Sequence, residues 1–153
     1  MHLTSRAFQE GKIIPSLYTC EGKNINPPLE FSGVPKGAKS LVLICDDPDV
    51  PKTRRPDGMY DHWVVFNMPP DTRGIPEHSR PPGIQGKNTN GDNQYTGPCP
   101  PDREHRYFFK LYALDRMLDL AAGATKKEVE HAMRGSVIAE CELMGRYEKN
   151  KGY

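Results

Sequence analysis

The sequence GPCPPDREHRYFF, residues 97–109, runs from a proline-rich loop directly into a segment that begins at His105. The three prolines restrict the backbone of the loop, and the aromatic residues that follow are typical of a β-strand. We expect two earlier segments, residues 46–49 and 61–63, to reach this stretch. Together the three segments are predicted to form a small polar pocket.

The length and composition of the chain predict one folded, soluble domain, residues 1–153. A chain of 153 residues can bury a core without metals or disulfides. The mean hydropathy of -0.72 is low, but the net charge of +1 is unlike the uncompensated charge of disordered chains. The 15 prolines are about twice the usual share of roughly 5%, which indicates many ordered loops.

Charge and hydropathy exclude several classes of protein. The isoelectric point near 7.7 and the lack of a Lys/Arg block argue against nucleic-acid binding. No window approaches the roughly 18 apolar residues of a membrane span, so stable membrane insertion is not expected. Residues 1–8 lack the apolar core of a signal peptide, so the expected location is cytoplasmic.

The four cysteines, Cys20, Cys45, Cys99 and Cys141, are dispersed and form no C-x-x-C pair. A zinc knuckle or a redox motif is therefore unsupported, and no cofactor is expected. Cys45 and Cys141 lie in apolar patterns typical of a core. Cys99 stands between prolines, where an exposed and reactive thiol is one interpretation.

Short apolar runs between turn residues predict strands. Residues 1–35 read as short strands and loops, and residues 40–45 form a continuous apolar run typical of a strand buried on both faces. Further strands are expected at 62–68 and 106–114. Residues 71–100 are a long irregular stretch, which favours a functional loop.

One helix is predicted near the C-terminus. Thr125 and Glu128 have the spacing of a capping box. Apolar residues then recur at helical spacing: Val129, Ala132, Met133, Val137, Cys141 and Met144. We expect a helix over this whole span, with Gly135 packed closely against the sheet. Several strands and one late helix indicate a mostly β sandwich.

Polar residues stand at the ends of apolar strand faces. Alternation places His105 with Tyr107 and Phe109, and Asp47 with Cys45. The same alternation places His62 on the face of Val64 and Phe66. Polar groups above an apolar floor are what a ligand pocket requires, although each residue alone also has a structural explanation.

Three motifs resemble those of the phosphatidylethanolamine-binding protein family, in particular its short bacterial and archaeal branch, which is labelled Raf-kinase-inhibitor-like. They are residues 47–51, residues 62–69, and residues 97–101 followed by 105–107. Residues 114–126 and the expected helix through Gly145 extend the resemblance over nearly the whole chain.

The resemblance implies a Greek-key β-sandwich with one or two short helices and a pocket for phosphate, phosphoethanolamine, acetate or cacodylate. By motif, the residues lining this pocket would be Asp47, His62, Gly97, His105 and Tyr107, with Pro51, Pro98 and Pro101 shaping its walls. A backbone N–H near Gly97, the tyrosine hydroxyl and a histidine could each donate to an anion. The X-Pro bonds of the motifs are candidates for the cis form.

These features predict a non-enzymatic protein that binds a small anion or a phosphorylated head group. A kinase-like protein partner and a homodimer are left open. The alternative is a metal-assisted hydrolase using Asp47, Asp49, His62 and His105, or a weaker version in which Cys99 is a nucleophile paired with His105. A third interpretation is a regulatory protein that inhibits a kinase or protease through its surface.

Overall fold

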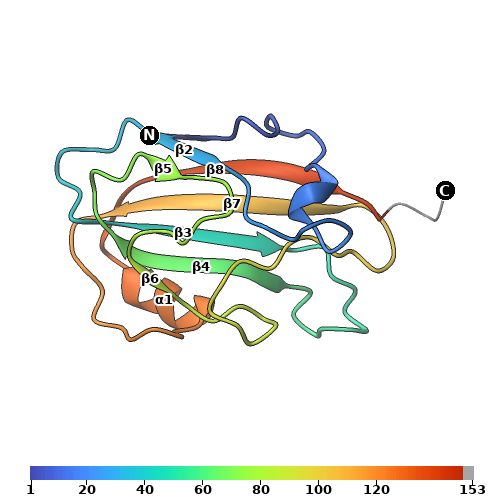
Figure 1. Cartoon of the computed structure of the whole chain (residues 1–153). Coiled ribbons are helices and arrows are strands. Elements are labelled where there is room, and N and C mark those ends of the chain that lie inside the picture. Colours follow the sequence, from blue (N-terminus) through green and yellow to red (C-terminus); the bar gives the residue numbers. More distant parts are fainter. Residues whose placement is uncertain (150–153) are drawn as a thin grey trace.

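Two antiparallel sheets pack face to face in the computed structural model, which describes residues 1–149 (Figure 1). The three-stranded sheet has the order β1 (His2–Thr4), β2 (Leu29–Ser32), β5 (Gly74–Ile75). The five-stranded sheet has the order β6 (Ile84–Gln85), β4 (Tyr60–Met68), β3 (Ser40–Asp47), β7 (His105–Leu114), β8 (Val137–Tyr147). The helices are η1 (Ser16–Tyr18), a 3-10 helix, and α1 (Lys126–Met133).

The predicted Greek-key sandwich is confirmed. After β4 the chain leaves the large sheet, adds β5 to the small sheet, and returns so that β7 lies beside β3. The chain segment 71–100, predicted to be irregular, contains the two short strands β5 and β6. The predicted domain also includes residues 150–153, which lie outside the described residues.

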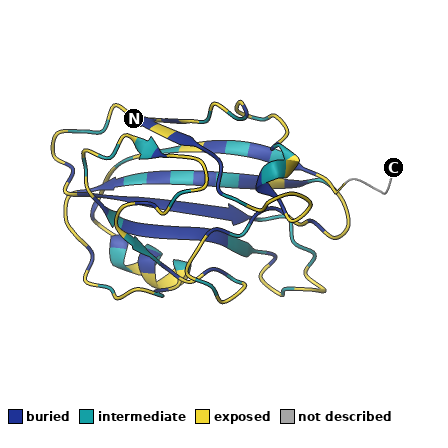
Figure 2. Cartoon of the chain, viewed as in Figure 1, coloured by how far each residue is buried: buried dark blue, intermediate teal, exposed yellow. Residues whose placement is uncertain are grey.

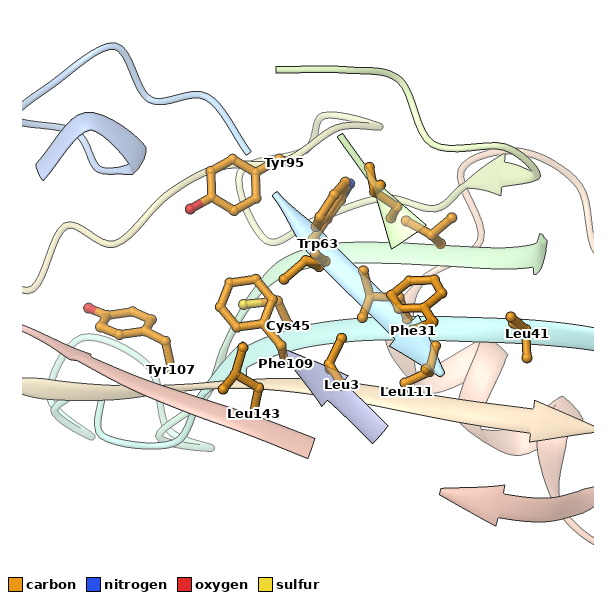
Figure 3. Close-up of a cluster of buried hydrophobic side chains, with 14 of the residues drawn as sticks. Leu3, Phe31, Leu41, Cys45, Trp63, Tyr95, Tyr107, Phe109, Leu111 and Leu143 are labelled. Atoms are coloured by element: carbon orange, nitrogen blue, oxygen red, sulfur yellow. The ribbon is translucent and has the colours of Figure 1, made fainter. Parts of the chain in front are cut away.

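Strand β3 lies at the centre of the large sheet and is buried along its whole length (Figure 2). Leu41, Leu43 and Cys45 face the small sheet, where they pack in the main core (Figure 3). Val42 and Ile44 face the other way and pack in a second core beneath α1. The continuous apolar run was correctly predicted to be buried on both faces, because each face has its own covering layer.

The predicted C-terminal helix is much shorter than expected. Its capping box is present, with Thr125 and Glu128 each bonding the other's backbone N–H, but the helix ends at Met133. Gly135 follows with φ of +80°, and a Cβ there would meet no atom within 4 Å. It is therefore a turn glycine chosen for its left-handed backbone, not for close packing.

Residues 137–147, predicted to continue the helix, instead form β8, which pairs with β7 along its length. The prediction was wrong because Val137, Cys141 and Met144 fit helical spacing, while Ala139, Cys141, Leu143, Gly145 and Tyr147 also fit the two-residue period of a strand. Without β8, the backbone groups of β7 would lack partners on that side. No helix within residues 1–149 is long and apolar enough to cross a membrane.

Candidate functional site

A β-bulge near the start of β4 decides where His62 points. Between Cys45 and Asp46 the pairing of β3 with β4 shifts by one residue, which leaves His62 extra. Regular alternation predicts His62 on the face of Val64 and Phe66, and this prediction is wrong. Those two residues pack on the helix side of the sheet, whereas the bulge turns His62 into a pocket on the opposite side.

The same bulge turns Asp61 to the helix side, where Asp46 already lies because it alternates with Ile44 along β3. Lys126, the first residue of α1, lies between them, with Nζ 3.0 Å from a carboxylate oxygen of Asp46 and 3.1 Å from one of Asp61. Lys110 on β7 lies 3.2 Å from the same Asp46 oxygen. The two adjacent aspartates at the end of β3 therefore have different roles. Asp46 holds α1 against the sheet through its ion pair with Lys126, and Asp47 faces the pocket.

The pocket has a volume of about 290 Å³ and lies where β3, β4 and β7 meet the proline-rich loop. Its lining residues are Asp47, Val50, Arg54, Arg55, Tyr60, His62, Thr96, Gly97, Cys99, Pro100, Pro101, His105 and Tyr107. In Figure 3, Tyr107 stands at one end of the main core with its hydroxyl directed away from the other side chains. The three predicted segments do meet, whereas the predicted wall residues Pro51 and Pro98 do not line the cavity.

His105 lies between two carboxylates. Its Nδ1 is 2.6 Å from Oδ2 of Asp47, and its Nε2 is 2.7 Å from Oδ1 of Asp102. Asp47 also accepts from the backbone N–H of Asp49 at 2.7 Å. Burial raises the pKa of Asp47, and the hydrogen bond from His105 partly opposes that rise. An imidazolium at this position can donate to both carboxylates, which fixes the ring in the pocket wall.

His62 has one nitrogen bonded and one free. Its Nδ1 lies 2.6 Å from the carbonyl oxygen of Thr96, and since a carbonyl only accepts, Nδ1 carries the proton. Burial lowers the pKa of His62 to about 4, so the ring is neutral near pH 7. Its Nε2 is buried without a hydrogen-bond partner and is left as an acceptor.

Tyr107 places a second buried polar atom in the pocket. The residue is 1% exposed and its hydroxyl makes no hydrogen bond of normal geometry. Burial and the neighbouring Asp47 carboxylate raise the pKa of Tyr107, so the hydroxyl keeps its proton. The ring packs edge-on against His62, with the centroids 5.2 Å apart. The two unsatisfied groups therefore belong to neighbouring rings that line the same pocket.

Asp49 is paired outside the pocket. Its carboxylate accepts from the guanidinium of Arg106 at 2.8 and 2.9 Å, and from the backbone N–H of the same residue at 2.9 Å. The pKa of Asp49 is lowered, chiefly by this guanidinium. In residues 1–149 no group of three or more His, Cys, Asp and Glu side chains is placed to hold a metal ion. Of the four donors of the predicted metal site, Asp47, His62 and His105 line the pocket, whereas Asp49 is held outside it by Arg106.

Gly97 is required by close packing and does not present a free donor. A Cβ at this position would lie 2.1 Å from the carbonyl oxygen of Tyr18 and 2.6 Å from Oδ1 of Asn24. Its N–H donates to that Asn24 oxygen at 2.7 Å. Gly97 lines the pocket as expected, but its own N–H is not free to bind an anion, because it already donates to Asn24.

Cys99 forms a disulfide with Cys20 and is not a free nucleophile. The bond joins the proline-rich loop to the segment after η1, where the backbone N–H of Cys20 also donates to the carbonyl of Pro98 at 3.1 Å. Pro98 therefore contacts the segment around Cys20 and does not line the pocket. Cys45 is buried as predicted and Cys141 is partly buried. No peptide bond among residues 1–149 is cis, so the cis candidates are not borne out.

Several lining residues were missed by sequence reasoning. Thr96 contributes a backbone carbonyl, which its side-chain type does not reveal. The Tyr60 ring packs at a tilt against the His62 ring, with the centroids 4.7 Å apart. The spacing of two residues between Tyr60 and His62 is a sequence signal that could have identified Tyr60. Arg54 and Arg55 lie in the loop between β3 and β4, and both line the cavity. They bring positive charge to its rim.

His62 makes stability depend on pH. Because the folded-state pKa is about 4 against an ordinary 6.5, the unfolded chain binds a proton that the folded chain does not, and stability is lost as pH falls from about 6.5 to about 4. The loss should reach about 3 kcal/mol. Urea unfolding at pH 4 and pH 7 should show this loss in the free energy of unfolding of the wild type, and His62→Gln should lack it. The control His131→Gln, at an exposed helix position, should keep it; identical pH dependence in wild type and His62→Gln would contradict the assignment.

Comparison with known proteins agrees with the fold and the motifs. The family model described as phosphatidylethanolamine-binding protein matches residues 4–148. A UPF0098 protein of Chlamydia trachomatis is 51% identical, covering 98% of this chain and 100% of that protein. A UPF0098 protein of Methanothermobacter thermautotrophicus is 50% identical, covering 97% and 99%.

Two solved structures are similar over nearly the whole chain. The phosphatidylethanolamine-binding protein homolog CT736 from Chlamydia trachomatis has a TM-score of 0.94 at 51% identity, covering 97% of each chain. Escherichia coli YbcL, described as a new member of the mammalian family, has a TM-score of 0.87 at 30% identity, covering 97% and 98%. From its motifs, fold and relatives, this chain belongs to the phosphatidylethanolamine-binding protein family.

Proposed function

We propose that this protein binds a small anion or a phosphorylated head group in the pocket between His62 and Tyr107. The observation that carries the proposal is that His62 Nε2 and the Tyr107 hydroxyl are both buried without hydrogen-bond partners, on neighbouring rings that line one pocket. Buried polar atoms are normally satisfied, and unsatisfied ones at a cavity are places for ligand atoms. A bound polar ligand would satisfy both.

The size and charge of the pocket favour a compact anionic group. A volume near 290 Å³ is at the small end of ligand pockets, which suits a head group better than an acyl chain. Arg54 and Arg55 line the rim, and guanidinium groups suit phosphate. The proposal therefore concerns the head group alone and requires no insertion into a membrane.

The binding role is proposed as non-enzymatic. Both ring nitrogens of His105 face carboxylates, and Nδ1 of His62 is bonded to a backbone carbonyl. Cys99 is held in a disulfide. His105 and Cys99 are therefore already engaged and are not available as the base and nucleophile of a hydrolytic mechanism, and nothing favours the hydrolase alternative.

A regulatory role through a protein partner, kinase-like or of another kind, and a homodimer remain proposals that follow from the binding role. The cytoplasmic location is a separate proposal, which rests on the sequence of residues 1–8. The Cys20–Cys99 disulfide weighs against that location, because disulfides are rare in reducing compartments. Cell fractionation decides between the cytosol and an oxidising compartment.

Titration with phosphoethanolamine, inorganic phosphate and acetate tests the binding function. We expect NMR signals of the His62 and His105 rings to shift and saturate at millimolar ligand or below. The matched control is His131, exposed on α1, whose signal should not move. Unchanged His62 and His105 signals with all three ligands would refute the proposal.

A further inference from the structure

The unsatisfied atoms of the pocket differ in hydrogen-bonding character. Nδ1 of His62 donates to the Thr96 carbonyl at 2.6 Å, so Nε2 is an acceptor whenever the ring is neutral. Tyr60, Tyr107 and His105 surround the ring, and Asp46 acts on it from the far side of the sheet. Burial lowers the pKa of His62, aided by His105, and outweighs the opposing effects of the Thr96 carbonyl and Asp46, so the ring is neutral near pH 7.

The Tyr107 hydroxyl offers the opposite function. Because it remains protonated and has no partner, it donates to whatever ligand atom lies beside it. The Asp47 carboxylate accepts from His105 and from the backbone N–H of Asp49, and it forms no hydrogen bond of normal geometry with the Tyr107 hydroxyl. A ligand that satisfies the pocket must therefore donate one hydrogen bond to His62 and accept one from Tyr107.

We propose that the pocket selects oxyacids that carry a negative charge and still retain a proton, such as a phosphomonoester monoanion or hydrogen phosphate, over fully deprotonated anions of the same shape. In this arrangement the P–O–H group donates to His62 Nε2, and another oxygen accepts from Tyr107. This inference rests on the proposed function and specifies its ligand class.

Sulfate is the discriminating comparison. It has the tetrahedral shape of phosphate but carries no proton near neutral pH, so one of its oxygens would face the lone pair of His62 Nε2. Phosphomonoesters lose their last proton at a pH near 6, and the protonated form is therefore well populated under mild conditions. A buried acceptor left without a donor weakens binding by an amount comparable to a lost hydrogen bond.

Calorimetric titration at pH 6 and matched ionic strength tests the inference. We expect inorganic phosphate to bind about 10- to 100-fold more tightly than sulfate. Equal affinity for the two anions overturns this inference and leaves the proposed binding function standing. Failure of phosphate, sulfate, phosphoethanolamine and acetate alike to bind removes both.

Two variants test whether His62 is the residue that causes this selectivity. Tyr107→Phe should lower the affinities for phosphate and for sulfate by similar factors, because both anions can accept from the hydroxyl. The ratio of the two affinities should therefore stay the same. His62→Gln should abolish the preference for phosphate over sulfate, since the glutamine amide can turn its NH₂ group toward a sulfate oxygen. A ratio that persists in folded His62→Gln contradicts the assignment.

A measurement on the wild type avoids any folding defect of the variants. The ¹⁵N signal of His62 Nε2 should have the shift of an unprotonated imidazole nitrogen in the free protein at pH 6, and should move when phosphate is added. A protonated Nε2 in the free protein overturns the inference.

Discussion

Alanine in place of His105 is expected to lower the free energy of unfolding by about 3–5 kcal/mol, the usual cost of removing one partner of a buried charged pair. His105 is 1% exposed and Asp47 is 3% exposed, and they are joined at 2.6 Å. The substitution leaves the Asp47 carboxylate buried without this donor. Urea unfolding followed by the fluorescence of Trp63, the single tryptophan, measures the change.

A neighbouring ion pair supplies the control for this prediction. Arg106, the next residue on β7, pairs with Asp49, but its side chain is 53% exposed. Arg106→Ala should therefore cost only about 0–1 kcal/mol. In addition, the double variant Asp47→Ala with His105→Ala should cost less than the sum of its single changes, because neither partner is then left alone. Equal costs for His105→Ala and Arg106→Ala would contradict the buried-pair account.

The second large effect is expected at the disulfide. Replacing Cys20 and Cys99 by serine should destabilise the protein by about 4 kcal/mol, since the bond closes a loop with a sequence separation of 79 residues and restricts the unfolded chain. The wild type in reducing agent should lose a similar amount. Thermal or urea unfolding with and without dithiothreitol provides the measurement.

Cys141→Ser is the matched control for the disulfide, because Cys141 is a free and partly buried cysteine. It should cost less than the double replacement, and it should remain sensitive to the reducing agent. The Cys20→Ser, Cys99→Ser double variant should be insensitive to it. An unfolding curve of the wild type that does not respond to reduction would refute the prediction.

The strands and much of the site could be predicted from the sequence. The apolar run of β3 needs burial on both faces, and the alternation along β7 places His105, Tyr107 and Phe109 together. The capping box correctly marks the start of α1. These features are local, because side-chain period, turn residues and caps depend on neighbours along the chain.

The end of α1 and the strand β8 could not be predicted in the same way. The apolar residues after Met133 fit both a helical and a strand period, so local pattern alone does not choose between them. Residues 137–147 form a strand because they pair with the edge of β7, whose backbone groups would otherwise lack partners on that side. This edge belongs to another segment of the chain, so the local pattern does not reveal it. The pairing of Cys20 with Cys99 is of the same kind, since the spacing of cysteines does not reveal which thiols meet.

The local sequence predicts that the polar pocket residues stand near strand ends beside proline-rich loops, because side-chain period and turn chemistry depend on neighbours along the chain. These residues are Asp47, His62, His105 and Tyr107. The direction in which His62 points depends on the fold. The bulge arises from the register between β3 and β4, and a shift of one residue moves a side chain to the other face of a sheet. The hydrogen bond that the Gly97 N–H donates to Asn24 likewise depends on packing between two segments far apart in the sequence. The free acceptor of His62 and the free donor of Tyr107 result from contacts between segments distant in the chain.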